Sequence, residues 1–107
     1  MDSTANIIIL ITTANDAEAH RIATVLLEGK KAACVNIIAG VNSLFWWQGQ
    51  LESEVENLLV VKTRASRLNE IIALVKANHS YDIPEIIALP IIGGNEDYLQ
   101  WLEKEVQ

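Results

Sequence analysis

The strongest constraint on the fold is a long run of strand-forming residues that one tight turn divides. Residues 32–47 are rich in valine, isoleucine and aromatic side chains, and residues 50–63 continue in the same manner. Gln48-Gly49 lies between them, and glycine accepts the positive φ that a two-residue hairpin turn requires. Gly40 marks a bend or bulge. The sequence therefore predicts a hairpin that is longer than one small domain can easily cover.

Shorter elements flank this hairpin. The apolar run over residues 6–12 predicts a strand buried on both faces. Asn15 is placed to cap a following helix, with Glu18 in the capping-box position. Gly29 marks the end of that helix, where a left-handed residue is easiest to place. The region before the hairpin is therefore predicted to be one strand and one helix.

The region after the hairpin is also predicted to contain one helix and one strand, but with the helix first. A second helix is predicted from about Ser66 to Asn78, and a last strand over residues 85–92. Pro90 restricts that strand to a sheet edge or a bulge, because proline cannot donate a ladder hydrogen bond. Asn95 is placed to cap a short final helix.

The predicted element order is β-α-β-β-α-β with an extra C-terminal helix. This is the α+β, ferredoxin-like pattern, in which two helices cover one face of a four-stranded antiparallel sheet. A length of 107 residues fits a single domain over residues 1–107. Half of the residues are apolar, which is more than so small a core usually needs. We therefore expect sheet edges to be buried against other copies of the chain.

The charge and the cysteine content exclude several classes of partner. The net charge of −6 argues against nucleic acid and against anionic membrane surfaces, whereas it is compatible with attracting cations. Cys34 is the only cysteine, so no internal disulfide can form. The apolar run at residues 7–11 is too short for a signal peptide or a membrane span. We therefore expect a soluble cytoplasmic protein.

The richest candidate site follows the second helix. His79, Tyr81, Asp82 and Glu85 fall within seven residues, and Pro84 stiffens the backbone between them. An imidazole and carboxylates on a stiff segment can bind a divalent metal or hydrogen-bond a polar ligand. The alternative is structural, with His79 closing the helix end while Tyr81 and Glu85 satisfy the loop backbone. The sequence contains no P-loop, dinucleotide-binding, nucleophile-elbow or zinc-protease motif, so we expect no enzyme.

Several residues of the hairpin are further candidates. Cys34 is interpreted as a small core residue or as a soft copper ligand. Trp46 and Trp47 must face opposite sides of a strand, and interface packing is the expected role of both. Lys62 is expected to form a salt bridge or to hold an anion.

Three glutamates on the second hairpin strand form a separate pattern. Glu52, Glu54 and Glu56 occupy alternate positions, so their side chains are expected on one face. They are interpreted as a cation site or as the solvated side of a hairpin arm.

Ordered blocks of sequence from residue 7 to residue 102 resemble the CutA divalent-cation-tolerance family. The matching stretches are KAACVNII at residues 31–38, WQG at 47–49, KT at 62–63, HSYDIPEII at 79–87, LP at 89–90, Gly94, Tyr98-Leu99 and Trp101. The resemblance implies a ferredoxin-like subunit and a homotrimer formed by sheet-edge pairing, similar to the PII signalling proteins. It also implies an association with divalent metals, copper among them.

The resemblance also implies a ligand pocket between subunits. The residues carried over to it are Cys34, Trp47, Lys62, His79, Tyr81 and Glu85. Within this set His79 and Glu85 are the candidate ligands for copper(II) or another divalent cation, and no cofactor is required. The leading hypothesis is a trimeric metal-response protein. A PII-like sensor of a small polar ligand is the second, and an enzyme with His79 as general base is a distant third.

Overall fold

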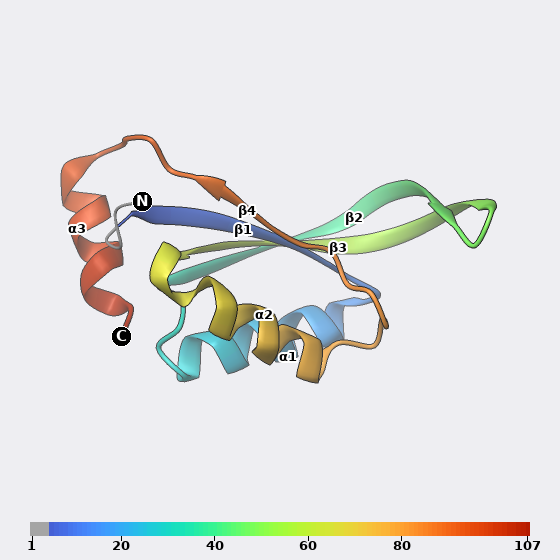
Figure 1. Ribbon diagram of the computed structural model, residues 1–107, viewed down its shortest axis with the longest axis horizontal. Helices are drawn as coiled ribbons and strands as arrows, with labels where there is room; N and C mark the ends of the chain where they lie inside the picture. Colours follow the sequence, from blue (N-terminus) through green and yellow to red (C-terminus); the bar gives the residue numbers. More distant parts are fainter. Residues whose placement is uncertain (1–4) are drawn as a thin grey trace.

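The predicted hairpin is the longest feature of the computed structural model, which describes residues 5–107 (Figure 1). Its strands are β2 (Cys34–Trp47) and β3 (Gln50–Arg64). Gln48 and Gly49 have φ values of 52° and 78°, the pair of positive φ angles that a type I′ turn requires. The register shifts between Ile38 and Val41, where Gly40 has a φ of 72°. The predicted hairpin and its bulge are therefore confirmed.

Two further strands complete the sheet at the base of the hairpin. They are β1 (Asn6–Thr13) and β4 (Ile86–Pro90). Within the described residues the sheet has four strands in the order β2-β3-β1-β4, and all neighbours are antiparallel. Pro90 lies at the end of an edge strand, as predicted. Pairing between β1 and β3 ends at Thr13 and Asn57, so the rest of the hairpin projects as an arm (Figure 1).

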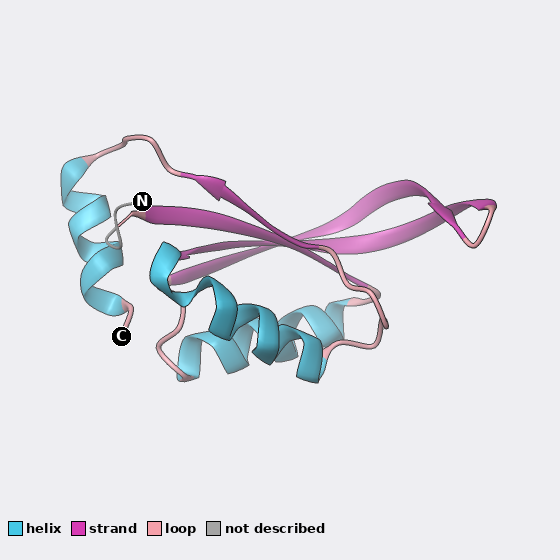
Figure 2. Ribbon diagram, viewed as in Figure 1, coloured by secondary structure: helices cyan, strands magenta, loops and turns pink. Residues whose placement is uncertain are grey.

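Helices cover one face of this sheet and one of its ends (Figure 2). The elements are α1 (Asp16–Glu28), the short 3₁₀ helix η1 (Ala65–Arg67), α2 (Leu68–Asn78) and α3 (Glu96–Glu105). The helices α1 and α2 lie side by side against the sheet, and α3 lies at the end opposite to the arm. The α+β ferredoxin-like fold with an extra C-terminal helix is therefore confirmed. None of the helices in residues 5–107 is long and apolar enough to cross a bilayer.

The core lies between the helices and the base of the sheet. Alternate residues of β1 and β3 point toward the helices and are buried; they are Ile7, Ile9, Ile11, Leu59 and Val61. The helices contribute residues of their predicted apolar stripes, which lie four positions apart in each helix: Ile22 and Leu26 from α1, and Ile71 and Val75 from α2. Ile8 and Leu10 on the other face are only partly buried. The prediction of a first strand buried on both faces is therefore wrong for the single chain.

The end of α1 differs from the prediction in one detail. Gly29 has a φ of −78°, so it is not the left-handed residue. Lys30 takes that conformation instead, with a φ of 59°, and its backbone N–H donates to the carbonyl of Leu27. The left-handed position thus lies one residue further along the chain than the glycine suggested.

Candidate functional site

Glu18 joins the start of α1 to the segment after α2. The Asn15 side chain accepts from the Glu18 N–H at 2.9 Å, which confirms the predicted cap. The Glu18 carboxylate accepts in return from the Ala14 N–H at 3.0 Å, and its second oxygen accepts from the Ser80 N–H at 2.7 Å. One carboxylate therefore joins the loop at Ala14 to the loop at Ser80, which lies 62 residues beyond Glu18 in the sequence.

This carboxylate is charged although it is only 3% exposed. Burial alone would raise the pKa of Glu18, because the charged form loses solvation. Hydrogen bonds from Ala14 and Ser80 outweigh this effect and lower the pKa of Glu18 below its ordinary value. The Arg21 guanidinium lies 3.6 Å from the carboxylate. Glu18 is therefore ionised, and its carboxylate holds the backbone at Ser80 in the candidate segment.

The side chain of His79 is fully buried, and both of its ring nitrogens form hydrogen bonds. The backbone N–H of Tyr81 donates to His79 Nδ1 at 3.0 Å, so the proton resides on Nε2. That N–H donates to the carbonyl of Thr12 at 2.7 Å. The ring thus connects the end of α2 to the end of β1. This role is structural, but it differs from the predicted closing of the helix end. A metal ion at His79 would have to displace one of these bonds.

Tyr81 continues the network from His79 to the hairpin arm. Its ring centroid lies 4.8 Å from that of His79. Its hydroxyl donates to the Glu56 carboxylate at 2.7 Å. Burial, then the hydrogen bond to Glu56 and the surrounding negative charges, raise the pKa of Tyr81 well above its ordinary value. The hydroxyl therefore remains a donor, and it fixes the loop against β3.

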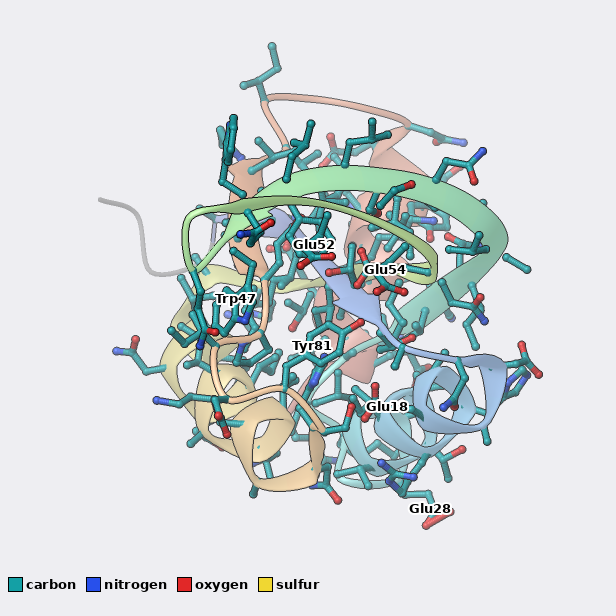
Figure 3. The ribbon with its side chains drawn as sticks, turned by 90° about the vertical axis from the view of Figure 1, so that its right-hand side faces the viewer. Glu18, Glu28, Trp47, Glu52, Glu54 and Tyr81 are labelled. Atoms are coloured by element: carbon teal, nitrogen blue, oxygen red, sulfur yellow. The ribbon has the colours of Figure 1, made fainter. Side chains whose placement is uncertain are left out.

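A groove of about 870 Å³ lies between the arm and the segment at residues 81–85. Five carboxylates line it: Glu52, Glu54, Glu56, Asp82 and Glu85. Three aromatic side chains also line it: Phe45, Trp47 and Tyr81. Figure 3 shows Glu52 and Glu54 on the arm, facing Tyr81 across the hollow, with Trp47 at its side. No lysine, arginine or histidine lines the groove among the described residues.

Within residues 5–107, the carboxylates of this groove have no positively charged partner. Glu56 is only 5% exposed, and among the hydrogen bonds of residues 5–107 its side chain has one, from the Tyr81 hydroxyl. None of the ion pairs in this part of the chain includes a carboxylate of the groove. A buried carboxylate without a nearby cation is costly. The groove is therefore a region of uncompensated negative charge.

The structure brings together only part of the predicted pocket. Trp47, Tyr81 and Glu85 line the groove, and His79 lies beneath Tyr81 without lining it. Cys34 and Lys62 are not among the lining residues; they pair with each other across β2 and β3. The assembly of all six residues in a pocket between subunits stays a prediction, as does metal ligation by His79 and Glu85.

Cys34 and Lys62 lie outside the groove and contact other residues of the sheet and of α3. The Lys62 ammonium donates to the side-chain oxygen of Asn36. Burial, followed by the neighbouring Cys34, raises the pKa of Tyr98 above its ordinary value. Among residues 5–107 Lys62 forms no salt bridge, and its side chain instead makes this hydrogen bond to a neutral amide.

The sequence did not reveal two important residues of the site. Glu18 was expected only as a capping residue, yet it also holds Ser80. Phe45 was missed, although it lies two residues before Trp47 and therefore on the same side of the strand. Within residues 5–107, no three histidine, cysteine or acidic side chains are arranged to hold a metal ion.

Comparisons with known proteins agree with the resemblance found in the sequence. The family model described as CutA1 divalent ion tolerance protein matches residues 7–105. The rice protein CutA 1, chloroplastic (Oryza sativa subsp. japonica), is 44% identical over 111 aligned residues, covering all of this chain but 63% of that protein. This chain therefore spans less than two thirds of the length of its rice relative.

Solved structures give the same result. The crystal structure of CutA1 from Oryza sativa has a TM-score of 0.94 at 44% identity, covering 98% of this chain and 96% of that chain. The periplasmic divalent cation tolerance protein CutA from Archaeoglobus fulgidus has a TM-score of 0.92 at 44% identity, covering 95% and 99%. The chain therefore belongs to the CutA1 family of divalent ion tolerance proteins.

Proposed function

We propose that this chain acts in the response to divalent cations, as a homotrimer that collects cations in the acidic groove. The observation that carries the proposal is the set of five carboxylates along one groove with no positive side chain among its described lining residues. Such a concentration of one sign of charge raises the local concentration of cations. A role that needs no bond-making chemistry also fits a chain without a recognised catalytic motif.

Copper(II) is the first metal to consider. Sites made of nitrogen and oxygen ligands bind Cu²⁺ more tightly than the other divalent ions of its row. Glu85 lies in the groove, so it is the member of the predicted metal pair that can meet a cation there without losing a structural bond. Because the described chain has no ready group of three ligands, we propose weak, exchangeable binding to which a neighbouring subunit adds donors.

Titration with Cu(II) tests this proposal. We expect the double variant Glu52→Gln/Glu54→Gln to bind Cu(II) on the order of tenfold more weakly, because each lost charge removes about 1 kcal/mol of attraction even in water. Glu28→Gln is the matched control, since Figure 3 places Glu28 far from the groove at the end of α1. Calorimetry in a non-coordinating buffer measures both. Equal affinities of the double variant and the control would exclude the groove as the cation site.

The trimer is supported by apolar surface that the single chain leaves open. On the sheet face away from the helices, Ile8 pairs with Leu89 and Leu10 pairs with Ile87. Leu89 and Ile87 are about half exposed, at 48% and 50%. Apolar surface of this kind on a sheet is usually buried by a partner. We propose that the other two subunits cover this face and that edge strands pair around it.

Sedimentation equilibrium tests the assembly. We expect a mass three times that of the chain at micromolar concentration. Leu89→Glu should shift the mass toward the monomer, because it places a charge in the proposed interface. Leu27→Glu on the outer side of α1 is the control and should remain trimeric, since Leu27 does not belong to the open sheet face. A monomeric wild-type chain would contradict the proposal.

A PII-like sensor of a small ligand is the second candidate. It is favoured by the aromatic side chains of the groove, which a metal ion alone does not require.

For the cellular location we propose the cytoplasm, because a chain with one cysteine forms no internal disulfide and needs no oxidising compartment. The names of relatives differ on this point, since the rice protein is called chloroplastic and the Archaeoglobus protein periplasmic.

A further inference from the structure

We infer that the hairpin arm, residues 41–56, is a hinged flap whose position is set by the hydrogen bond between Tyr81 and Glu56. This is a conformational property of the fold, and it does not depend on which ion or molecule enters the groove. It therefore goes beyond the proposed function. Two features support it: a joint in the sheet where the arm begins, and a hydrogen bond that holds the arm to the rest of the chain.

The joint lies where the sheet narrows to two strands. Pairing between β1 and β3 ends at Thr13 and Asn57, so only β2 and β3 continue into the arm. At the same place two residues of β2, Ala39 and Gly40, lie opposite the single residue Asn57. Such a bulge interrupts the ladder and bends the strand, and a ribbon of two strands is a weak element by itself. The sheet can therefore bend at Gly40.

Gly40 has the conformation and the space that a hinge residue needs. Its φ of 72° lies in a region that glycine enters without steric cost. Among the described residues, nothing outside its chain neighbours lies within 4 Å of the position that a Cβ would take. Asn57 on the other strand is fixed, because its side chain donates to Asp16 at 3.1 Å and its carbonyl accepts from the Thr13 hydroxyl at 3.5 Å. The bend is thus confined to the point where the arm begins.

The bond from the Tyr81 hydroxyl to the Glu56 carboxylate, the latch, holds the arm against the segment after α2. Its length is 2.7 Å, and Glu56 is only 5% exposed. A hydrogen bond to an ionised carboxylate is about twice as strong as one between neutral groups. Among residues 5–107, no other side-chain hydrogen bond or ion pair joins residues 41–56 to the rest of the chain. The latch is therefore the specific attachment of the arm.

Apolar packing adds little to this attachment. Four large apolar side chains of the arm are between 61% and 74% exposed: Leu44, Trp46, Leu51 and Val55. Elements with few buried apolar contacts lie at the low end of local stability. We therefore expect the arm to move before the sheet at its base opens.

A change in the position of the arm changes the groove. Trp47 and Glu52 line the groove from the arm, and Tyr81 lines it from the segment after α2 (Figure 3). At about 3.3 Å per residue, the tip at Gly49 lies about 23 Å from Glu56, so a rotation of about 20° moves the tip by about 8 Å. The latch therefore sets the width of the groove.

Backbone amide relaxation, measured by NMR on the intact protein, tests the latch. We expect Tyr81→Phe to lower the order parameters of residues 41–55 from about 0.85, the value of a rigid backbone, to about 0.6 or less. Phenylalanine keeps an aromatic ring beside His79 and removes only the hydroxyl that donates to Glu56. Tyr98→Phe is the matched control and should leave the arm unchanged, because α3 lies at the end opposite to the arm (Figure 1).

A second substitution tests the hinge. Asparagine adopts a positive φ more readily than most residues with a side chain, but it lacks the freedom of glycine. We therefore expect Gly40→Asn, added to Tyr81→Phe, to raise the order parameters of the arm above those of Tyr81→Phe alone. Gly93→Asn is the control, since Gly93 lies in the loop after β4 and should restore nothing.

Three outcomes overturn the inference. An arm that is as ordered in Tyr81→Phe as in the wild type is held by something else, such as a second copy of the chain. An equal loss of order in β1 and in the arm means that the hydroxyl supports the whole sheet. Order parameters that Gly40→Asn does not raise exclude the hinge at Gly40. The Cu(II) titration is independent of all three, so failure of the proposed function is recognised separately.

Discussion

Replacement of His79 by alanine is expected to lower the free energy of unfolding by about 3 kcal/mol. The ring is fully buried, and its loss leaves the Thr12 carbonyl and the Tyr81 N–H without partners. Each unsatisfied buried group costs about 1–3 kcal/mol, and the space left by the ring adds to the loss. The segment that carries Tyr81 and Glu85 should also become mobile, because the ring is its link to β1.

Urea unfolding of the variant and the wild type at one protein concentration measures this effect, because the stability of an oligomer depends on concentration. His20→Ala is the matched control. His20 is exposed on α1, and among the hydrogen bonds and ion pairs of residues 5–107 its side chain joins only Asp16, so its loss should change stability by less than about 0.5 kcal/mol. Equal stabilities of the two variants would show that His79 does not hold the segment in place.

Replacement of Glu18 by glutamine is expected to cost about 2 kcal/mol at neutral pH. The carboxylate accepts from Ala14 and Ser80 through different oxygens. A glutamine amide offers one oxygen, so its NH₂ group must face one of these two N–H donors. Glu28→Gln on the same helix is the control, and it should leave stability nearly unchanged because Glu28 is exposed.

The same substitution should change the pH dependence of stability. The pKa of Glu18 is lower in the folded protein than its ordinary value of 4.5, so its contribution is present above about pH 4.5. The contribution is lost as the pH falls through the lower folded pKa, because protonation then discharges the carboxylate. The stability difference between wild type and Glu18→Gln should therefore shrink from pH 7 to pH 3 in urea unfolding. A difference that stays constant over this range would contradict the assigned ionisation.

Local chemistry was enough to predict most of the fold. Two strand-forming segments around Gln48-Gly49 can only form a hairpin, and the helical stripes show which sides of α1 and α2 face the sheet. Turns and caps depend on a few adjacent residues, so the Asn15 cap and the bulge near Gly40 were predictable. The left-handed position at Lys30 was missed, because a glycine that permits positive φ need not adopt it.

The candidate site was only partly predictable from the sequence. The sequence by itself determined that an acidic arm and a segment with His79, Tyr81 and Glu85 are present, because residue type and strand periodicity are local properties. Only the tertiary structure decided that the buried His79 ring connects α2 to β1, and that Glu56 is a buried carboxylate hydrogen-bonded by Tyr81. Those roles depend on contacts such as Thr12 with His79 and Glu56 with Tyr81, which are 67 and 25 residues apart. No local pattern encodes such contacts, since the packing of the whole sheet and its helices sets them.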